Sequence, residues 1–240
     1  MSITVSNLTK KYGRNTALNN VTVTINEGMY GLLGKNGAGK TTFMRILTTI
    51  LPYDTGSVEI CGIPHRKARD IRKIIGYLPQ DFSLYPSLTV YEALDYCGVL
   101  SEIPKHERRE RIAELLEKTN LTAESKKKVK ALSGGMKRRL GIAQAMMNDP
   151  KVLIVDEPTV GLDPEERVNF REMLTSYAAG RVVILSTHIV EDIEETCGVI
   201  GILDNGNLVF DGSIDVFKEQ MKSTKLETAY MNLLKGGKRK

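Results

Sequence analysis

Two segments near the start of the chain alternate between apolar and polar positions with a period of two. Residues 3–5 and 21–25 follow this pattern, which places their apolar side chains on one face of a strand. Residues 29–33 form a short apolar run instead, and this run leads directly into glycines. We expect these segments, together with residues 57–60 and 74–78, to be strands.

Helical patterns alternate with strand patterns in much of the remaining chain. Residues 40–51 form a predicted helix that Pro52 ends. After residue 150 the pattern runs strand, helix, strand, helix and strand, at residues 152–155, 165–178, 181–185, 189–195 and 199–203. A last short helix is predicted over residues 226–234. This alternation is typical of a mainly parallel sheet with helices on both faces, so we expect an α/β core.

The middle of the chain interrupts this alternation. From residue 89 to about residue 118 the pattern is helical, with one narrow apolar stripe among many charges. Residues 119–130 are polar and predicted to form a loop, and a further helix follows it and ends at Pro150. We therefore expect one domain with an inserted helical subdomain. Its parts are a core at residues 1–88 and 149–225, the helical subdomain at 89–148, and a C-terminal helix with a basic tail at 226–240.

Composition and charge narrow the function classes. With 41% hydrophobic and 26% charged residues, the chain has the composition of an ordinary globular protein. No run of about 18 apolar residues occurs, so no membrane-spanning helix is expected. The first residues lack the basic start and apolar core of a signal peptide, which predicts a cytoplasmic chain. The net charge is +5, but no aromatic residues are interleaved with the basic runs, so nucleic acid is not an expected partner.

Residues 34–41 read Gly-Lys-Asn-Gly-Ala-Gly-Lys-Thr and fit the phosphate-loop pattern G-x-x-x-x-G-K-[ST]. The motif follows a predicted strand and opens a predicted helix, which is the context that the pattern requires. Its glycines permit turns in which backbone N–H groups surround phosphate oxygens, and the helix dipole adds positive potential. Lys40 is expected to neutralise phosphate oxygens and Thr41 to bind Mg²⁺. A nucleoside triphosphate site is therefore predicted.

Polar residues also follow other predicted strands. Asp156 ends the apolar strand at 152–155 and can hold Mg²⁺ through water, and Glu157 can act as the general base for an attacking water. His188 follows the strand at 181–185, a position that favours a phosphate-sensing or water-orienting role over a structural one. Gln80 can reach Mg²⁺ or the attacking water, and Tyr12 can stack on an adenine ring, although each signal alone is weak.

A second candidate phosphate site lies in the segment Leu132-Ser133-Gly134-Gly135. Ser133 can be the N-cap of the helix that follows, and a helix N-terminus opened by Ser-Gly-Gly is suited to bind an anion. The chain thus carries two predicted phosphate sites. The residues alone leave open which phosphate the second site binds.

These motifs, in this order, resemble those of the ATP-binding cassette (ABC) ATPases over nearly the whole chain. The most specific part is Leu132 to Gly135, which is similar to the ABC signature that other phosphate-loop proteins lack. Met136 is a departure, because many members carry Gln there. The resemblance implies an α/β fold: a P-loop NTPase core with a mainly parallel sheet, an N-terminal antiparallel β subdomain and an inserted α-helical subdomain.

The resemblance also assigns roles, with ATP and Mg²⁺ as cofactors. Glu157, His188 and Gln80 are the implied catalytic residues. The implied magnesium ligands are Thr41, Gln80 and Asp156. The implied nucleotide contacts are Tyr12, Gly34, Lys35, Asn36, Gly37, Ala38, Gly39, Lys40, Thr41, Thr42, Ser133, Gly134 and Gly135. The segment Gly161-Leu162-Asp163 matches the D-loop of the family.

In the family, two cassettes face each other head to tail, and the signature of one binds the γ-phosphate of the ATP held by the other. The resemblance therefore implies a homodimer or a dimer with a close paralogue. It also implies separate transmembrane permease subunits that dock near residues 81–100, at the cytoplasmic face of the cell membrane. The motifs look most like the branch that powers drug and antibiotic-peptide exporters.

Two other functions compete with that of an exporter ATPase. A non-transport ABC ATPase, such as one in cluster assembly, remains possible because it too has a single cassette. A regulatory module that no longer hydrolyses ATP is disfavoured because Lys40, Asp156, Glu157 and His188 are all intact.

Overall fold

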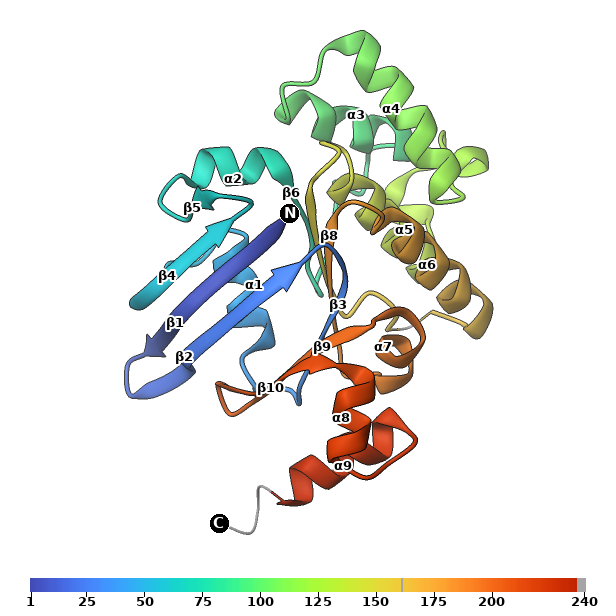
Figure 1. The fold of residues 1–240 in the computed structure, drawn as a ribbon. Coiled ribbons are helices and arrows are strands. Elements are labelled where there is room, and N and C mark those ends of the chain that lie inside the picture. The colour runs from blue at the N-terminus through green and yellow to red at the C-terminus, as the bar shows by residue number, and fades with distance from the viewer. Residues whose placement is uncertain (161, 237–240) are drawn as a thin grey trace.

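Ten strands form two sheets in the computed structural model, which describes residues 1–160 and 162–236 (Figure 1). The first sheet is antiparallel and has the order β2-β1-β4-β5. Its strands are β1 (Ser2–Tyr12), β2 (Asn15–Asn26), β4 (Thr55–Ile60) and β5 (Ile63–Pro64). Buried and exposed residues alternate along β2, as the period of two predicts.

The second sheet has the order β10-β9-β3-β8-β7-β6 and is parallel except for β10. Its strands are β3 (Gly28–Leu33), β6 (Ile75–Leu78), β7 (Val152–Asp156), β8 (Val182–Thr187), β9 (Val199–Asp204) and β10 (Asn207–Ser213). The predicted fold class is confirmed: an α/β protein with a mainly parallel sheet and an antiparallel N-terminal sheet.

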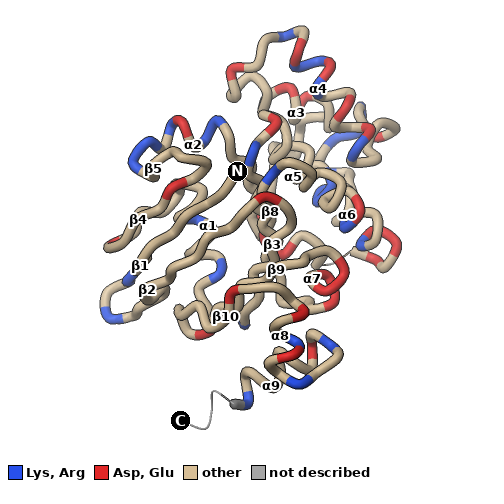
Figure 2. Tube along the Cα trace, in the orientation of Figure 1, with Lys and Arg blue, Asp and Glu red and all other residues tan. Residues whose placement is uncertain are grey.

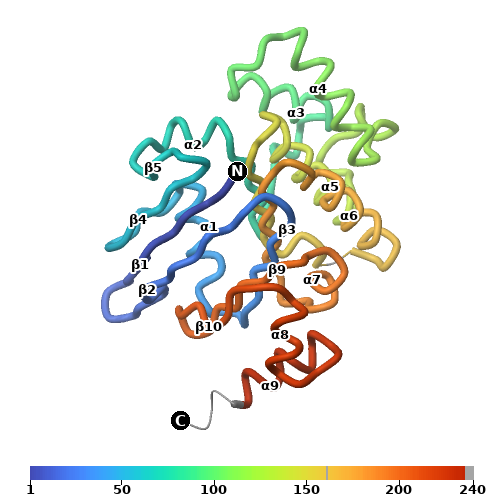
Figure 3. The backbone as a smooth tube through the Cα atoms, in the orientation of Figure 1, coloured from blue at the N-terminus to red at the C-terminus, as the bar shows by residue number. Residues whose placement is uncertain are grey.

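The helices cover the parallel sheet and extend beyond it. They are α1 (Lys40–Leu47), α2 (Ala68–Ile74), α3 (Val90–Leu100), α4 (Lys105–Lys118), α5 (Gly134–Ala145), α6 (Pro164–Tyr177), α7 (Val190–Thr196), α8 (Ile214–Gln220) and α9 (Leu226–Gly236). Helices α3, α4 and α5 come between β6 and β7 in the chain. Helices α3 and α4 lie at the end of the molecule opposite α8 and α9 (Figure 3).

The parallel sheet is buried on both faces. Along β7, Val152 and Ile154 pack with α1, α2 and the antiparallel sheet, whereas Leu153 and Val155 pack with helices α3 to α9. A strand buried in this way reads as a continuous apolar run because both of its faces need apolar side chains. The structure therefore has three layers, with α1, α2 and the antiparallel sheet on one side and helices α3 to α9 opposite.

The first helix is shorter than predicted. It ends at Leu47 rather than before Pro52, because Thr49 takes a left-handed backbone with φ 59°. The amides of Ile50 and Leu51 then both donate to the carbonyl of Arg45, at 3.0 Å each. The prediction of a helix over residues 40–51 was wrong in its last turn, because a tight turn and not the proline stops it.

The remaining differences concern short elements. Residues 89–118 form two helices, α3 and α4, separated at Glu102, which has φ 59°. Helix α2 includes Ile74, which was expected to begin a strand, and the predicted loop at 119–130 contains two short 3₁₀ turns. Strands β5 and β10 and helices α2 and α8 were not predicted at all.

The two histidines outside the motifs, His65 and His106, differ in their surroundings. His106 is exposed. His65 is half-buried, with Nε2 2.7 Å from the carbonyl oxygen of Ile46 and its ring edge-on to Tyr53. His65 therefore adds a side-chain contact to a carbonyl at the end of α1, which also accepts from the N–H of Thr49 at 2.9 Å.

Positively and negatively charged residues are interspersed along α4 (Figure 2). Within residues 1–160 and 162–236, no helix combines the length and the apolar character that crossing a membrane requires. The end of the predicted basic tail, residues 237–240, lies outside the described residues.

Gly76 supports a stability prediction for the packing of β6 on α5. A Cβ added at Gly76 would collide with the carbonyl oxygen of Ala145 and approach the Pro150 ring at 2.9 Å. Because a backbone carbonyl cannot rotate away, Gly76→Ala should lower the free energy of unfolding by about 1–3 kcal/mol, measured by urea denaturation. Gly198→Ala is the matched control, since no atom of the described residues lies within 4 Å of its added Cβ. Equal unfolding midpoints for the two variants would contradict this packing.

Candidate nucleotide site

The carboxyl ends of three parallel strands meet at one edge of the sheet. Leu33 at the end of β3 pairs with Thr187 at the end of β8, and Asp156 at the end of β7 pairs with Ser186. The segments that follow these strands therefore start side by side. They are the phosphate loop at 34–39, the pair Asp156-Glu157, and the pair Thr187-His188. Ligands of open α/β sheets bind at this kind of edge.

The phosphate loop wraps around the Lys40 ammonium. Its Nζ donates to the carbonyl of Gly34 at 2.6 Å and lies 3.4 Å from the carbonyl of Lys35, and the side chain is 6% exposed. Burial lowers the pKa of Lys40, while the charges of Glu157 and Asp156 oppose this shift. Gly39 has φ +109°, and an added Cβ there would lie 2.6 Å from the carbonyl oxygen of Ala17, so the loop needs glycine at this point.

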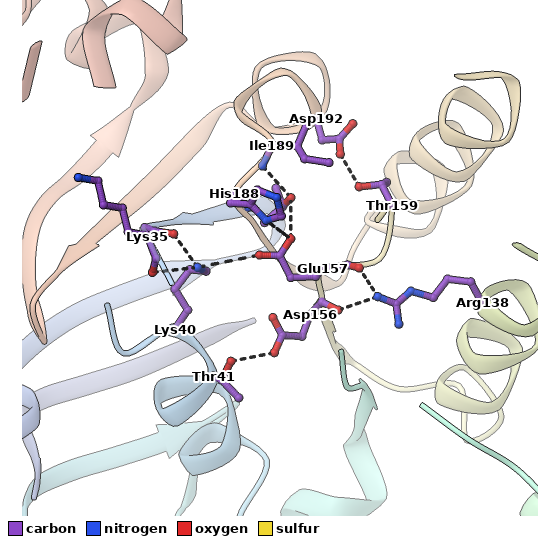
Figure 4. A network of polar contacts seen from close by, with 12 residues as sticks. Lys35, Lys40, Thr41, Arg138, Asp156, Glu157, Thr159, His188, Ile189 and Asp192 are labelled. Carbon is purple, nitrogen blue, oxygen red and sulfur yellow. Dashed lines mark hydrogen bonds and ion pairs between the residues drawn. The ribbon is translucent and has the colours of Figure 1, made fainter. Parts of the chain in front are cut away.

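Two carboxylates face the phosphate loop from the end of β7 (Figure 4). Asp156 is buried, and its Oδ2 accepts a hydrogen bond from Thr41 Oγ1 at 3.1 Å. Glu157 is also buried, and its Oε1 lies 4.0 Å from Lys40 Nζ. Burial raises the pKa of Asp156, although the hydrogen bond from Thr41 counteracts this. A hydroxyl and a carboxylate side by side are suited to bind a divalent cation together with phosphate oxygens.

The other oxygen of Glu157 is held by the end of β8. Its Oε2 accepts from Thr187 Oγ1 at 3.2 Å and lies 2.9 Å from His188 Nδ1. A carboxylate can only accept, so Nδ1 carries the proton in this contact, which leaves Nε2 of a neutral ring as an acceptor. The imidazole is about half exposed. His188 thus links the candidate base to the open side of the site.

Glu157 also has an unusual backbone. Its φ is 50°, in the left-handed region that non-glycine residues seldom adopt. Its N–H donates to the carbonyl of Ser186 at 2.8 Å, which joins the end of β7 to β8. Strained conformations of this kind cost about 1–3 kcal/mol and are concentrated at functional sites. With this backbone conformation, the carboxylate of Glu157 points toward Lys40.

These groups line a cavity of about 470 Å³ beside the phosphate loop. The predicted site residues on its wall are Tyr12, Lys35, Asn36, Gly37, Gly39, Lys40, Thr41, Thr42, Gln80, Asp156 and Glu157. Gly34 and Ala38 belong to the same loop but do not line the cavity, and His188 reaches it through Glu157. Tyr12 is 48% exposed, so its ring is accessible to a stacking base.

Sequence reasoning missed a part of this wall. The cavity is also lined by Asn15, Thr16, Ala17, Asn205 and Gly206, from the turns between β1 and β2 and between β9 and β10. The pair Asn205-Gly206 is a typical two-residue hairpin turn, and both residues have positive φ. That signal predicts a hairpin but not its place beside a phosphate loop.

The Ser-Gly-Gly segment does not contribute to this cavity. Ser133 caps α5, because its Oγ accepts from the N–H of Met136 at 3.2 Å, and Ser133 and Gly134 are exposed. Gly135 is buried, and an added Cβ would collide with the carboxylate of Glu166. None of the three residues belongs to the cavity wall in the described part of the chain. The N-terminus of α5 therefore offers its N–H groups outward.

The segment after Glu157 connects the site to α6 and α7. Thr159 Oγ1 donates to Asp192 Oδ2 at 2.5 Å, and Asp192 is fully buried and paired with Arg171 at 3.3 Å. Asp163 caps α6 by accepting from the N–H of Glu166. Gly161 of the predicted D-loop lies outside the described residues. Thr159 and Asp192 carry no motif, so sequence reasoning gave no reason to pair them.

A groove lies next to Gln80 on the side of the inserted helices. It encloses about 330 Å³ and is lined by Phe82, Ser83, Leu84, Pro86, Val129, Lys130, Lys137 and Leu140. Most of these side chains are apolar, and the two lysines add positive charge to the groove. The nearby side chain of Tyr85 is 57% exposed and stacks edge-on against Tyr96.

The described residues contain no cluster of three or more His, Cys, Asp or Glu side chains that could hold a metal ion. A cation in the cavity would depend on Thr41 and Asp156, with substrate oxygens and water completing its shell. Magnesium is commonly bound in this way, through one or two carboxylates and phosphates. The donor set therefore fits Mg²⁺ bound with a nucleotide.

Comparisons with known proteins agree with this geometry. The sequence profile of the ABC transporter family matches residues 18–160. The linearmycin resistance ATP-binding protein of Bacillus subtilis is 37% identical, over 86% of this chain and 68% of that protein. A Nod factor export ATP-binding protein of Ralstonia nicotianae is 40% identical, over 88% of this chain and 66% of that protein. The chain thus spans about two-thirds of the length of these relatives.

Solved structures share the fold almost throughout. An ATP-binding subunit of an ABC transporter has a TM-score of 0.89 and 28% identity, covering 98% of this chain and 100% of its own. A dimeric cassette in a post-hydrolysis state, bound to ADP and phosphate, has a TM-score of 0.80 at 28% identity, covering 88% and 98%. A Clostridium perfringens protein that is part of an ABC transporter complex has a TM-score of 0.82 at 27% identity, covering 98% of each chain.

Asp156 supports a prediction for the protein without nucleotide. Because burial raises its pKa above the unfolded value, its charge costs stability. This cost is fully present above the folded-state pKa and disappears as the pH falls through it. At pH 7.5, without nucleotide or metal, Asp156→Asn should therefore raise the free energy of unfolding, by about 1 kcal/mol for each unit of pKa shift. Urea denaturation measures this. A lower stability of the Asn variant would mean that the attraction to Lys40 outweighs the cost of burial.

Proposed function

Because this chain belongs to the ABC transporter family of ATP-binding proteins, we propose that it hydrolyses ATP to drive an exporter whose membrane-spanning subunits are separate chains. The observation that carries the hydrolytic part is the Glu157 carboxylate. It is held between Lys40, Thr187 and His188, at the wall of a cavity formed by a phosphate loop. This arrangement supports a base aimed at the terminal phosphate of a bound nucleotide.

The predicted site residues near the cavity have separate roles in this proposal. The N–H groups of the phosphate loop and the Lys40 ammonium bind the β- and γ-phosphates, and Tyr12 stacks on the adenine. Thr41, Asp156 and Gln80 hold Mg²⁺, which supplies positive charge to the phosphate oxygens. Glu157 accepts the proton of the attacking water, and His188 keeps the carboxylate oriented.

The second phosphate site has a role only if another chain supplies the phosphate. Ser133, Gly134 and Gly135 stand outside the cavity, at the exposed N-terminus of a twelve-residue helix. We assign them to the γ-phosphate of ATP held by a second copy or a close paralogue. The related cassette that is dimeric with ADP and phosphate supports this arrangement. The nucleotide then joins the two chains, and hydrolysis removes the joining charge.

The export role depends on the relatives and on the groove beside Gln80. The named relatives act in linearmycin resistance and Nod factor export, and a related structure is part of a transporter complex. The apolar groove follows Gln80 directly, so a helix of a membrane subunit that docks at residues 81–100 can shift a magnesium ligand. In this proposal the chain works at the cytoplasmic face of the membrane through such subunits.

The shared site predicts a nucleotide-dependent dimer. Glu157→Gln removes the base but keeps the shape and the hydrogen-bonding ability of the side chain, so ATP with Mg²⁺ should trap the dimer. Light scattering coupled to size exclusion measures the mass. Adding Ser133→Arg should abolish the dimer while the affinity for ATP stays within about twofold, because Ser133 is outside the chain's own cavity. A Glu157→Gln chain that stays monomeric contradicts the shared site, and loss of ATP binding with Ser133→Arg would place Ser133 in its own chain's site.

The transport role predicts a membrane partner that depends on the groove. Tagged Glu157→Gln chain, captured from its native cells in mild detergent with ATP, should bring down a polytopic membrane protein in near-equal amount, identified by mass spectrometry. Adding Ser83→Arg should abolish this capture, because Ser83 is exposed and lines the groove. Ser87→Arg, also exposed but outside the groove wall, is the matched control and should retain it. Recovery of only proteins without membrane spans, such as cluster-assembly proteins, would contradict transport and leave the ATPase chemistry intact.

A further inference from the structure

The side chain of Arg138 joins two segments of the site that are far apart in the sequence. Arg138 lies on α5, five residues after the Ser133 cap. On one side, its guanidinium donates to the carbonyls of Pro79 at 3.3 Å and Gln80 at 2.8 Å, which follow β6. On the other side, its Nε donates to the carbonyl of Pro158 at 3.0 Å, which follows β7.

The same guanidinium reaches the two residues that carry the carboxylates. It donates to the carbonyl of Asp156 at 3.3 Å and to the carbonyl of Glu157 (Figure 4). Five backbone carbonyls therefore converge on one cation, and all three of its nitrogens are used. The negative ends of converging carbonyl dipoles repel each other, so this arrangement requires a central positive group with several donors. A planar guanidinium fits this requirement, whereas a lysine ammonium offers fewer donors from one point.

The contact with the Glu157 carbonyl acts on a strained residue. Glu157 has φ 50°, and its own N–H is bound to the carbonyl of Ser186. Arg138 holds its carbonyl, so both backbone polar groups of this residue are fixed. The direction of the carboxylate follows from the backbone, because a left-handed residue released to an ordinary conformation points its side chain elsewhere. The ammonium of Lys40, 4.0 Å from Oε1, does not control the backbone in this way.

We propose that Arg138 is a positioning residue for ATP hydrolysis, which fixes the Glu157 carboxylate and the Gln80 side chain by holding the backbone carbonyls of both segments. This role rests on the proposed function, because it acts through Glu157 as the base. It also ties both segments to the helix whose N-terminus carries Ser133, Gly134 and Gly135. Nothing in the local pattern of residues 132–140 reveals this role, because the two partner segments meet only in the fold.

Arg111 provides a matched control in the same helical region. It is also a half-buried arginine bound to a backbone carbonyl, that of Met146 at 2.8 Å, at the C-terminal end of α5. Its other partners among the described residues are the carboxylates of Glu114 and Asp149. Replacing Arg111 therefore removes a comparable structural contact without touching either segment of the site.

The experiment compares Arg138→Gln, Arg138→Lys and Arg111→Gln with the unaltered chain. It measures kcat and KM for ATP with Mg²⁺, the dissociation constant for ATP, and the melting temperature. Arg138→Gln should lower kcat by about 10- to 100-fold, because a misplaced base loses alignment with the water. Its dissociation constant for ATP should stay within about twofold, because the phosphate loop is unchanged. Arg138→Lys should recover part of kcat, and Arg111→Gln should lower kcat by less than about twofold even where it melts earlier.

A double variant separates positioning from general stability. In a Glu157→Gln chain the base is already absent, so adding Arg138→Gln should lower the residual rate by less than about twofold. If Arg138→Gln lowered the residual rate of the Glu157→Gln chain by the same factor as it lowers the rate of the unaltered chain, the inference would be overturned. An Arg138→Gln chain that loses activity only in proportion to its ATP binding, or no more than Arg111→Gln does, would also overturn it. If Arg138→Gln does not fold, Arg138→Lys takes its place in both comparisons, where a kcat equal to that of the unaltered chain would be decisive against the role.

The proposed function fails in a different way. An unaltered chain without ATPase activity, or a Glu157→Gln chain that hydrolyses ATP at the full rate, would overturn the assignment of Glu157 as the base and the Arg138 role with it. Full activity in the unaltered chain and in Arg138→Gln alike would overturn only the Arg138 role.

Discussion

The register of three parallel strands is the constraint on which the whole site depends. Because Leu33 pairs with Thr187 and Asp156 pairs with Ser186, the phosphate loop, the carboxylates and the histidine leave the sheet at the same level. A slip of one residue would exchange the two faces of a strand. In β7 that slip would place Ile154 on the face that now holds Val155, and Val155 on the face that now holds Ile154. It would also withdraw Asp156 from Thr41. The apolar packing on both faces of the sheet therefore fixes the chemistry at its edge.

Within that frame, the buried charge of Lys40 determines what its neighbours must be. An ammonium that is 6% exposed is costly unless it is paired and hydrogen-bonded. Here the carbonyl of Gly34 bonds it directly, while Asp156 and Glu157 balance its charge from across the cavity. Burial lowers the pKa of Lys40, and the two carboxylates oppose this shift. The ammonium and the carboxylates thus lie a few ångströms apart in the site. An incoming polyphosphate and its cation can complete this arrangement.

The sequence predicted the parts of the structure whose signals are local. The phosphate loop, the β7 strand with its two acids and the Ser133 cap each form a contiguous pattern, and they occur where they were expected. Helices α2 and α8 have seven residues each and give only a weak period, although α7, which is equally short, was predicted. The end of α1 depends on the backbone of Thr49. Strand β10 did have a signal in Asn205-Gly206, which was overlooked. The contacts of Arg138, and the pairing of Thr159 with Asp192, could not be predicted, because each joins segments that only the tertiary fold brings together.

Helix α5 carries both the Ser133 cap and Arg138, so in the proposed function a phosphate bound outside the cavity can affect the groups inside it. Ser133 and Arg138 are five positions apart, so their side chains point in directions roughly 140° apart around the helix axis. Ser133 lies at the exposed end of the helix, and Arg138 donates hydrogen bonds to carbonyls of the segments after β6 and β7. A helix of twelve residues is stiff over this distance. In the proposed function, a shift of its N-terminus would therefore displace Arg138 and the carbonyls of Gln80 and Glu157 that it holds. The proposal therefore gives one helix two roles: its N-terminus faces the phosphate of a second chain, and its Arg138 holds the segments of the chain's own cavity.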